Sequence, residues 1–465
     1  MSATEGAKTL QDIVERVSSV SEYLYNNTTG ARPFPVVSPE FSNWRDEQRA
    51  WRETVALMDQ SHHMTDLYVT GPDAFRLLEG LAINSFRNFE PGQAKQLVVC
   101  NPDGFVIGDA IMFYLEPERF QLVGRPSAHN WVEYHALKSG LNVSVERDEW
   151  SVSDPNRPRK VFRFQLQGPN AKALMEALNG GPIPSLKFFH MGWITIAGRR
   201  LRLLQHGMAG VQGGEIFGPY EWRDEVRAAI VEAGRAFGLK QVGARAYGTN
   251  TLESGWISGP VPAVYTSPEL EAYRRWLPAT SYEATGSLGG SFFSPRIEDY
   301  YLTPWDLGYG HILKFDHEFV GEAALRLKAQ EPHRHKVTLV WNPDDVLQVM
   351  QTWLRPGQPG KFIEFPIARY AMWPYDRVVN RQGELVGFST SSGFSWNERA
   401  MLSLAMVDEA YATPGTEVVL VWGEPEGGSR KPSVEPHVPM EIRATVGPVP
   451  YAAPARAFRE QLRSR

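Results

Sequence analysis

The 465-residue chain has one cysteine, no long apolar run and no block of like charges, and each absence excludes a class of protein. Cys100 has no partner for an internal disulfide, which favours a reducing compartment. No run approaches the roughly 18 apolar residues that cross a bilayer, and the start MSATEGAKTLQD lacks the features of a signal peptide. We therefore expect a cytoplasmic protein with no membrane partner.

The charge distribution and the histidine spacing argue against two kinds of ligand, nucleic acid and a metal ion. A net charge of -5 without a polybasic block argues against nucleic acid as a partner. His333 and His335 form a lone His-x-His on a charged link with no clear third ligand, so we expect no metal site. The length predicts two or three domains, and the sequence leaves the oligomeric state open.

One pattern occurs twice in the first half of the chain. VTGPDAFRLLEGL at Val69 to Leu81 and LQGPNAKALMEAL at Leu166 to Leu178 both predict a strand, a Gly-Pro turn and a helix. Asp73 or Asn170 can cap the helix that follows. The repeat predicts two related α/β modules. Further strands are expected at Phe105 to Tyr114, Arg119 to Val123, Ile194 to Leu204 and Glu215 to Gly218.

The last third of the chain has a different pattern. After the charged link, short apolar runs are separated by Gly and Pro, which favours a small β-barrel. The clearest strands are Lys336 to Trp341, Gly387 to Thr390, Leu402 to Val407 and Glu417 to Trp422. The expected fold class is α+β. Two intertwined α/β domains, the first with an N-terminal extension, occupy residues 1–335, and a β-barrel domain occupies residues 336–465.

Several motifs follow one another in the order of a known family. LQHGMAGVQGGEI at Leu204 to Ile216 is followed about 30 residues later by GAR and LESG, within QVGARAYGTNTLESGW at Gln241 to Trp256. FQLQGP, TPWDLGYG, FVGEAAL and FSTSSGFS with LSLAMVD complete the series between about residues 45 and 450. The chain resembles the folate-binding family of the glycine-cleavage aminomethyltransferase, which typically shows SRTGYTGEDGFEI, GARD and LEAG.

The resemblance implies a three-domain ring with tetrahydrofolate in its central opening. Glu215 takes the position of the last acid of the motif, where a carboxylate can accept hydrogen bonds from the pterin's 2-amino and N3 groups. Its alternative is an exposed strand carboxylate. Trp256 is expected against the pterin face, with a core tryptophan as the alternative. Arg245 and Gln167, from the matched GAR and FQLQGP motifs, are the other expected folate contacts of this group.

Departures from the family pattern indicate a different reaction. The arginine of SRTG is Gln205 here, and the acid after GAR is Ala246. The family's Asp-Asp pair is reduced to Gly108 and Asp109. Because an acid there helps to handle the transferred amine, glycine cleavage is disfavoured. Asp109 is expected to contact folate, with a strand-end turn acid as its alternative.

Two extra residues between GAR and LESG, together with DQSHHMTDLYVTGPDA and LVGR, narrow the resemblance. They are similar to those of the tetrahydrofolate-dependent aromatic O-demethylases, which act on vanillate- and syringate-type compounds. Such enzymes move an aryl ether methyl group to N5 of tetrahydrofolate and release a phenol. The implied partner is a small methoxylated aromatic acid.

Tyr247 lies in the insertion and is the expected proton donor to the departing phenolate. Its ordinary pKa of about 10 is near that of a phenol, so proton transfer between them is nearly balanced. A buried tyrosine with a hydrogen-bonded hydroxyl is the alternative.

Four more residues are expected on the substrate side. Arg125 suits a substrate carboxylate because its planar fork binds both oxygens, although a surface arginine is also compatible. His62 and His63 lie just before a strand, where alternation would place them on opposite faces, so only one lines the site. His63 is favoured, as a catalytic residue that makes a polar contact to the ring hydroxyl or carboxylate, and an N-cap or core histidine is the alternative. Phe34 is expected to line the pocket where some relatives carry Tyr, which favours a bulkier ring such as syringate.

Two other functions remain as alternatives: a glycine-cleavage aminomethyltransferase and a non-catalytic folate-binding protein. Non-catalytic relatives often carry a KGCYTGQE-like motif, and this chain has no cysteine there.

Overall fold

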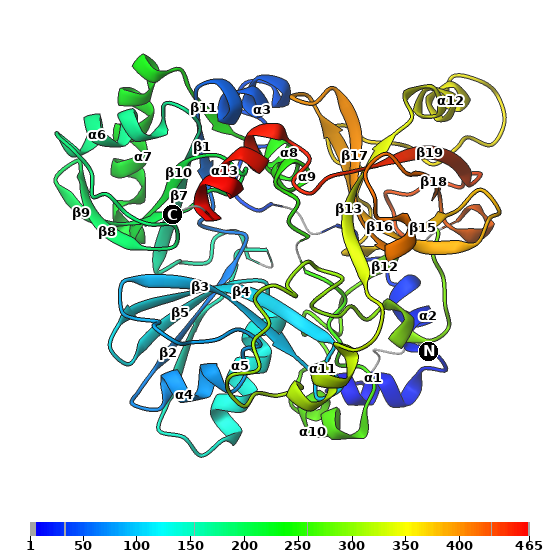
Figure 1. Cartoon of the computed structure of the whole chain (residues 1–465), viewed down its shortest axis with the longest axis horizontal. Coiled ribbons are helices and arrows are strands. Elements are labelled where there is room, and N and C mark those ends of the chain that lie inside the picture. Colours follow the sequence, from blue (N-terminus) through cyan, green and yellow to red (C-terminus); the bar gives the residue numbers. More distant parts are fainter. Residues whose placement is uncertain (1–5, 32–33, 153, 258, 429, 464–465) are drawn as a thin grey trace.

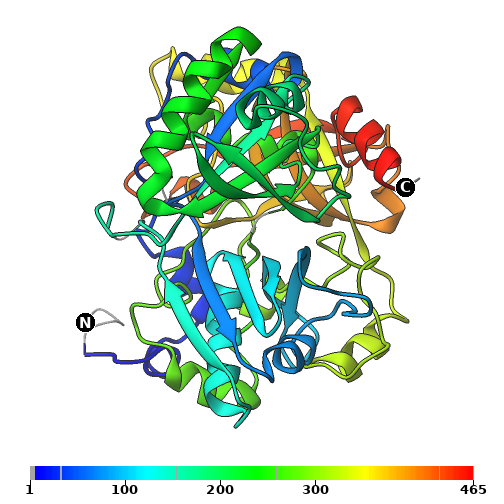
Figure 2. The ribbon, with the colours of Figure 1, turned by 90° about the vertical axis from the view of Figure 1, so that its left-hand side faces the viewer.

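The computed structural model describes residues 6–31, 34–152, 154–257, 259–428 and 430–463. Three parts surround a central region: two sheets with helices and a closed barrel (Figure 1). The two sheets lie one above the other when the molecule is turned (Figure 2). The α+β fold class expected from the sequence is therefore confirmed.

The first module is an antiparallel sheet with helices on one side, drawn in blue and cyan in Figure 1. Its strands, in spatial order, are β3 (Gln93–Cys100), β4 (Val106–Glu116), β5 (Arg119–Gly124), β2 (Thr65–Thr70) and β6 (Ser144–Asp148). Helices α5 (Pro126–Lys138) and α4 (Ala74–Glu79) accompany them. Packed against this sheet are α1 (Leu10–Arg16), α2 (Val20–Tyr25), α10 (Glu271–Trp276) and α11 (Glu322–Lys328), whose apolar residues share one core with it.

The second module has a six-stranded sheet with α6 (Ala171–Asn179) and α7 (Arg223–Gly234). Its strands, in spatial order, are β11 (Leu239–Val242), β1 (Val55–Asp59), β7 (Val161–Gln167), β10 (Gly213–Pro219), β9 (Arg199–Gln205) and β8 (Met191–Ile196). Because β1 precedes β2 of the other sheet and β7 follows its β6, the chain passes from the second module to the first and back.

The repeated strand, turn and helix is present in both modules, as β2 with α4 and β7 with α6. The glycine after each strand has a left-handed φ, +135° at Gly71 and +127° at Gly168. A Cβ at Gly71 would lie 2.4 Å from the carbonyl oxygen of Asn142, and one at Gly168 would lie 2.5 Å from that of Thr54. Both turns therefore require glycine for the same two reasons, conformation and space.

We expect Gly168→Ala to lower the free energy of unfolding by about 1–3 kcal/mol, since a methyl group there strikes backbone. Denaturant titration would measure the change. Gly181→Ala is the matched control because a Cβ at Gly181 meets nothing within 4 Å, and a change below about 0.5 kcal/mol is expected. Equal losses in the two variants would contradict this account of the turn.

Two local expectations are wrong. Neither Asp73 nor Asn170 caps its helix with its side chain. The Asp73 carboxylate accepts from the Asn142 amide at 2.8 Å, and Asn170 Nδ2 donates to the Phe237 carbonyl at 2.9 Å, so distant segments take these groups. The segment from Ile194 to Leu204 is a hairpin, β8 and β9, whose turn has Ala197 and Gly198 at φ +51° and +73°.

The barrel is closed, as predicted, and its six strands bury a separate apolar cluster. Its strands in order are β13 (Arg334–Trp341), β17 (Ala400–Asp408), β16 (Leu385–Ser395), β15 (Asp376–Val379), β18 (Glu417–Trp422) and β19 (Met440–Gly447). Helix α12 (Pro343–Trp353) packs against β19. Because β13 begins at Arg334, the first barrel strand starts two residues before the expected division at 335/336, and the division into two domains remains a prediction.

Three short elements connect these parts near the centre of the molecule (Figure 1). They are α8 (Ala244–Tyr247), α9 (Asn250–Ser254) and the last helix, α13 (Ala453–Arg463). Helix α13 is held to α9 by a bond of 3.0 Å from Arg459 to the Ser254 carbonyl. No helix in the described ranges is long and apolar enough to cross a membrane.

Candidate active site

A cavity of about 1430 Å³ lies where the three parts meet. Side chains from both modules, the barrel and α13 form its walls. Eight of the ten residues expected at the site line it: Phe34, His63, Asp109, Arg125, Glu215, Arg245, Tyr247 and Trp256. Residues more than 200 positions apart in the sequence, such as Phe34 and Trp256, are thus brought into one space.

Tyr247 ends helix α8, and the N-terminal extension holds that helix in place. The amides of Ala244 and Arg245 donate to carbonyls of Ser38 and Pro39 at 2.9 and 3.1 Å. A Cβ at Gly243 would lie 2.3 Å from the Pro39 carbonyl oxygen, so the close approach requires glycine there. The extension that supplies Phe34 therefore also builds the start of α8.

The Tyr247 hydroxyl is buried and has two nitrogen neighbours. Gln60 Nε2 donates to it at 3.1 Å, and His63 Nε2 lies 3.1 Å from it. The Phe34 ring packs against both partners, with centroid distances of 4.2 Å to His63 and 4.4 Å to Tyr247. These four side chains make one compact group at the cavity wall, which we call the tyrosine cluster.

Burial changes the titration of this cluster. It raises the pKa of Tyr247 well above its ordinary value and lowers the pKa of His63 well below its own, with the Arg125 charge adding to the shift of His63. His63 is therefore neutral and Tyr247 protonated at pH 7. The near-balance between Tyr247 and a phenol, expected from ordinary pKa values, does not hold in this environment.

Arg125 lies between β5 and the N-terminus of α5. Its side chain passes over Gly259, where a Cβ would lie 2.6 Å from Cδ, so glycine leaves the room it needs. Its positive charge lowers the pKa of Tyr247, His63 and Asp109, which locates it near all three. Arg125 is thus a cation of the cavity beside the tyrosine cluster.

Glu215, on β10, anchors one end of a buried ionic chain. Arg163 Nη1 donates to Glu215 Oε1 at 2.6 Å, and Arg163 Nη2 donates to Asp66 at 2.9 Å. The Arg163 guanidinium lies between the rings of Phe113 and Phe217, 4.8 Å from each centroid. Burial raises the pKa of Glu215, while Arg163 opposes that rise. Within the described part of the chain, Glu215 Oε2 has no hydrogen-bond partner, so it is available to a ligand in the cavity.

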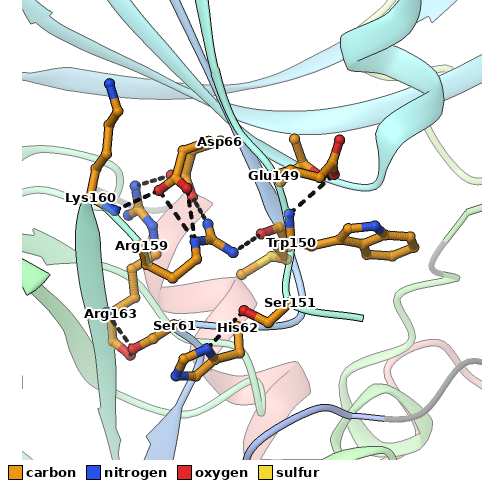
Figure 3. A network of polar contacts seen from close by, with 12 residues as sticks. Ser61, His62, Asp66, Glu149, Trp150, Ser151, Arg159, Lys160 and Arg163 are labelled. Carbon is orange, nitrogen blue, oxygen red and sulfur yellow. Dashed lines mark hydrogen bonds and ion pairs between the residues drawn. The ribbon is translucent and has the colours of Figure 1, made fainter. Parts of the chain in front are cut away.

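His62 belongs to a wall behind the cavity and does not line it (Figure 3). Its Nδ1 lies 3.0 Å from the Ser151 hydroxyl, and its Nε2 lies 3.3 Å from that of Tyr220. Figure 3 also shows Asp66 held by Arg159 and Arg163. Of the two histidines, only His63 lines the cavity, and both lie in the bend between β1 and β2, so strand alternation is not the cause.

Asp109 is the end of a second polar chain. The Tyr309 hydroxyl donates to Asp109 at 2.7 Å, Gln96 Nε2 donates at 2.6 Å, and Trp256 Nε1 donates to Tyr309 at 2.9 Å. Burial raises the pKa of Asp109. A Cβ at Gly108 would lie 2.5 Å from the Ser127 hydroxyl oxygen and 3.0 Å from the Ala128 amide nitrogen, so a side chain here would crowd the start of α5.

Arg245 and Gln167 are engaged with protein groups. Arg245 binds Glu40 and the Phe365 carbonyl at the cavity wall. Gln167 does not line the cavity; its amide donates to the His206 carbonyl at 3.2 Å and accepts from the Ala209 amide at 3.2 Å. Gln167 therefore positions the loop 206–212, which forms part of the wall.

Four functional neighbours were missed from the sequence: Gln60, Arg163, Tyr309 and Arg369. Arg163 had a usable signal, because polar residues alternate with Phe162 and Phe164 along β7. Tyr309 lies in the quoted TPWDLGYG motif but was given no role. Gln60 and Arg369 carry no pattern of their own and reach the cavity only through the tertiary fold.

Comparisons with known proteins identify the family. The model of the GCVT N-terminal domain family matches residues 19–260, more than half of the chain. The chain belongs to the GCVT family. Its curated relatives include a syringate O-demethylase of Sphingobium sp., 49% identical over 450 residues and covering 97% of each chain. A sesamin methylene transferase of Sinomonas sp. is 31% identical and covers 90% of this chain and 91% of its own.

More distant GCVT proteins share the architecture. An aminomethyltransferase of Streptomyces coelicolor is 27% identical over 382 residues, 82% of this chain and 85% of its own. The crystal structure of the aminomethyltransferase T of Bartonella henselae superposes with a TM-score of 0.58 at 19% identity, over 88% of this chain and 90% of its own. This likeness shows the shared fold.

As a member of the GCVT family, the chain is a tetrahydrofolate-dependent methyltransferase. The cavity fits tetrahydrofolate in chemistry. It presents the free oxygen of Glu215, an anionic acceptor suited to the N–H groups of a pterin edge, and the aromatic side chain of Trp256.

Proposed function

We propose that the protein O-demethylates a methoxylated aromatic acid of the vanillate or syringate type, producing the corresponding phenol and 5-methyltetrahydrofolate. The observation that carries the proposal is the tyrosine cluster, which places a protonated, doubly supported hydroxyl beside Arg125 in the cavity that also contains Glu215. The 49% identity to a protein named syringate O-demethylase supports it.

In the proposed reaction, the bond from the aryl oxygen to the methyl carbon breaks as the bond from that carbon to nitrogen forms. Tetrahydrofolate supplies N5 as the methyl acceptor. Tyr247 gives its proton to the departing aryl oxide, and the proton lost from the acceptor nitrogen returns to the protein through solvent. Atoms and charge balance without an oxidant or a metal ion.

The raised pKa of Tyr247 makes proton donation harder, and its neighbours offset part of that cost. Gln60 Nε2 already donates to the phenolic oxygen. Neutral His63 with its proton on Nε2 donates to the same oxygen, so the Tyr247 hydrogen is left to point at the substrate. Two such donors stabilise the negative charge that develops on Tyr247 during transfer. His63 thus acts through Tyr247.

The remaining roles follow from position. Arg125 holds the substrate carboxylate, and Phe34 forms an apolar wall for the ring. Phenylalanine at this position favours syringate over vanillate. Glu215 holds the pterin edge, with Asp109 and Trp256 as further contacts on that side. Arg245 supports this wall through Glu40. We place the reaction in the cytoplasm, and the substrate is a small molecule.

Glycine cleavage is the second candidate, favoured by the family alone. The single acid at this place weighs against it, because Gly108 replaces one acid of the aminomethyltransferase pair and a side chain there would crowd the start of α5.

The proposal is tested by incubating purified protein with tetrahydrofolate and either vanillate or syringate. We expect stoichiometric 5-methyltetrahydrofolate and demethylated phenol, with more rapid turnover of syringate and no product when tetrahydrofolate is omitted. The absence of both products would refute O-demethylation, and activity in a glycine-cleavage assay would favour the second candidate.

A further inference from the structure

We propose that Arg369 is a second arm of the substrate-carboxylate site and that, with Arg125, it makes the enzyme select aromatic acids over neutral methoxyarenes. This inference rests on the proposed function and adds a specificity-determining residue to it. Arg369 comes from the barrel side of the molecule, between α12 and β14 (Trp373–Pro374), whereas Arg125 comes from the first module. The proposed site thus joins two parts of the fold.

The first argument is an incomplete set of hydrogen bonds. Arg369 lines the cavity, and its Nη2 donates to the Met372 carbonyl at 2.7 Å. Its Nε is buried and has no hydrogen-bond partner among the residues that the structure describes. A buried donor without an acceptor is costly, and native proteins usually retain one only where a ligand or water completes it.

The second argument is charge. No carboxylate of the described residues pairs with Arg369, whose one recorded polar partner is a neutral carbonyl. Burial and then the neighbouring charge of Arg125 lower the pKa of Arg369 to about 10. Two guanidinium groups thus line the same cavity and repel each other, and Arg369 stays charged at pH 7. An anion bound between them would remove the repulsion.

The shape of the guanidinium groups favours a carboxylate as this anion. Each planar fork can donate to one or both oxygens, and such charge-assisted bonds are about twice as strong as neutral ones. Arg125 lies near Tyr247 and His63, so a ring whose carboxylate bridges the two arginines has its ether groups on the side of the tyrosine cluster.

The carboxylates of the glutamate part of tetrahydrofolate are a second source of the same chemistry. Other cations of the cavity suit them better, namely Lys336, on β13, and Arg459, on α13. Burial and then the charge of Arg459 lower the pKa of Lys336 to about 7, and the charge of Asp109 opposes that shift. The experiment below separates the two sources.

The test compares Arg369→Met and Arg369→Lys with the wild type. Titration calorimetry would measure the Kd for syringate, for 2,6-dimethoxyphenol, which lacks the carboxylate, and for tetrahydrofolate. We expect Arg369→Met to weaken syringate binding about tenfold or more and to leave the other two affinities unchanged. Arg369→Lys should recover part of the loss, since it restores charge without the fork.

Arg381→Met is the matched control, because Arg381 is an exposed arginine of the barrel paired with Glu417. It should change no affinity. In the ligand-free protein, Arg369→Met should leave Tm unchanged or raise it, since it removes an unpaired buried charge. A lower Tm would instead assign Arg369 a structural role.

The outcomes distinguish the two levels of the proposal. If the wild type converts syringate but Arg369→Met weakens syringate and 2,6-dimethoxyphenol equally, or weakens only tetrahydrofolate, then the inference about Arg369 is wrong and the proposed function stands. If the wild type neither binds nor converts any methoxylated acid, the proposed function is wrong, and so is the inference about Arg369 that rests on it.

Discussion

Replacing Tyr247 by phenylalanine is expected to lower turnover about 10²- to 10⁴-fold, the usual contribution of a general acid. The change removes only the hydroxyl, so the ring still packs against Phe34 and His63. Without that proton the aryl oxide leaves as a bare anion, with no hydroxyl to protonate it. Single-turnover formation of 5-methyltetrahydrofolate measures the effect.

Tetrahydrofolate affinity should be unchanged in Tyr247→Phe, since its expected contacts lie on the Glu215 side of the cavity. Tyr220→Phe is the matched control, because the Tyr220 hydroxyl contacts His62 outside the cavity. That variant should keep near-normal turnover. If Tyr247→Phe also turns over normally, Tyr247 is not the acid.

Replacing Glu215 by alanine is expected to weaken tetrahydrofolate binding by about 1.5–3 kcal/mol, or roughly 10- to 150-fold. Oε1 is held by Arg163, so the loss concerns the ligand bonds of Oε2 and the position of the whole carboxylate. Equilibrium binding of tetrahydrofolate measures it, independently of turnover.

Alanine also leaves Arg163 with Asp66 alone, and breaking a buried ion pair costs stability. Glu215→Gln is therefore the informative companion, because its amide oxygen can still accept from Arg163 while its NH₂ group faces the pterin donors. It should lose affinity but retain most of the Tm. Glu232→Gln, on the exposed face of α7, is the neutral control. Unchanged affinity in both Glu215 variants would contradict the pterin contact.

Local patterns in the sequence predicted much of the fold. The two Gly-Pro turns and the short apolar runs near the C-terminus identified the modules and the barrel, since these depend on nearby residues. The helix caps could not be predicted, because Asp73 and Asn170 bind groups from distant segments. The β8–β9 hairpin was missed although Gly198 marked its turn.

The order of the motifs indicated which residues lie around one cavity. It did not predict the partners with which those residues form hydrogen bonds and ion pairs. The neighbours that set the chemistry of Tyr247 and Glu215 are Gln60 and Arg163, from other strands and loops. The pKa of Tyr247 likewise depends on burial, which a linear sequence does not state. Predicting such effects requires the packed structure.

The position of the lone cysteine bears on whether the methyl donor and the methyl acceptor bind together or in turn. Cys100 is fully buried in the core of the first module, does not line the cavity, and has a thiol pKa raised by burial. Cys100 therefore cannot act as a covalent carrier that accepts the methyl group from the substrate and later transfers it to the acceptor. In the proposed direct transfer, donor and acceptor occupy the cavity together, so the reaction passes through a ternary complex and the transferred carbon inverts once.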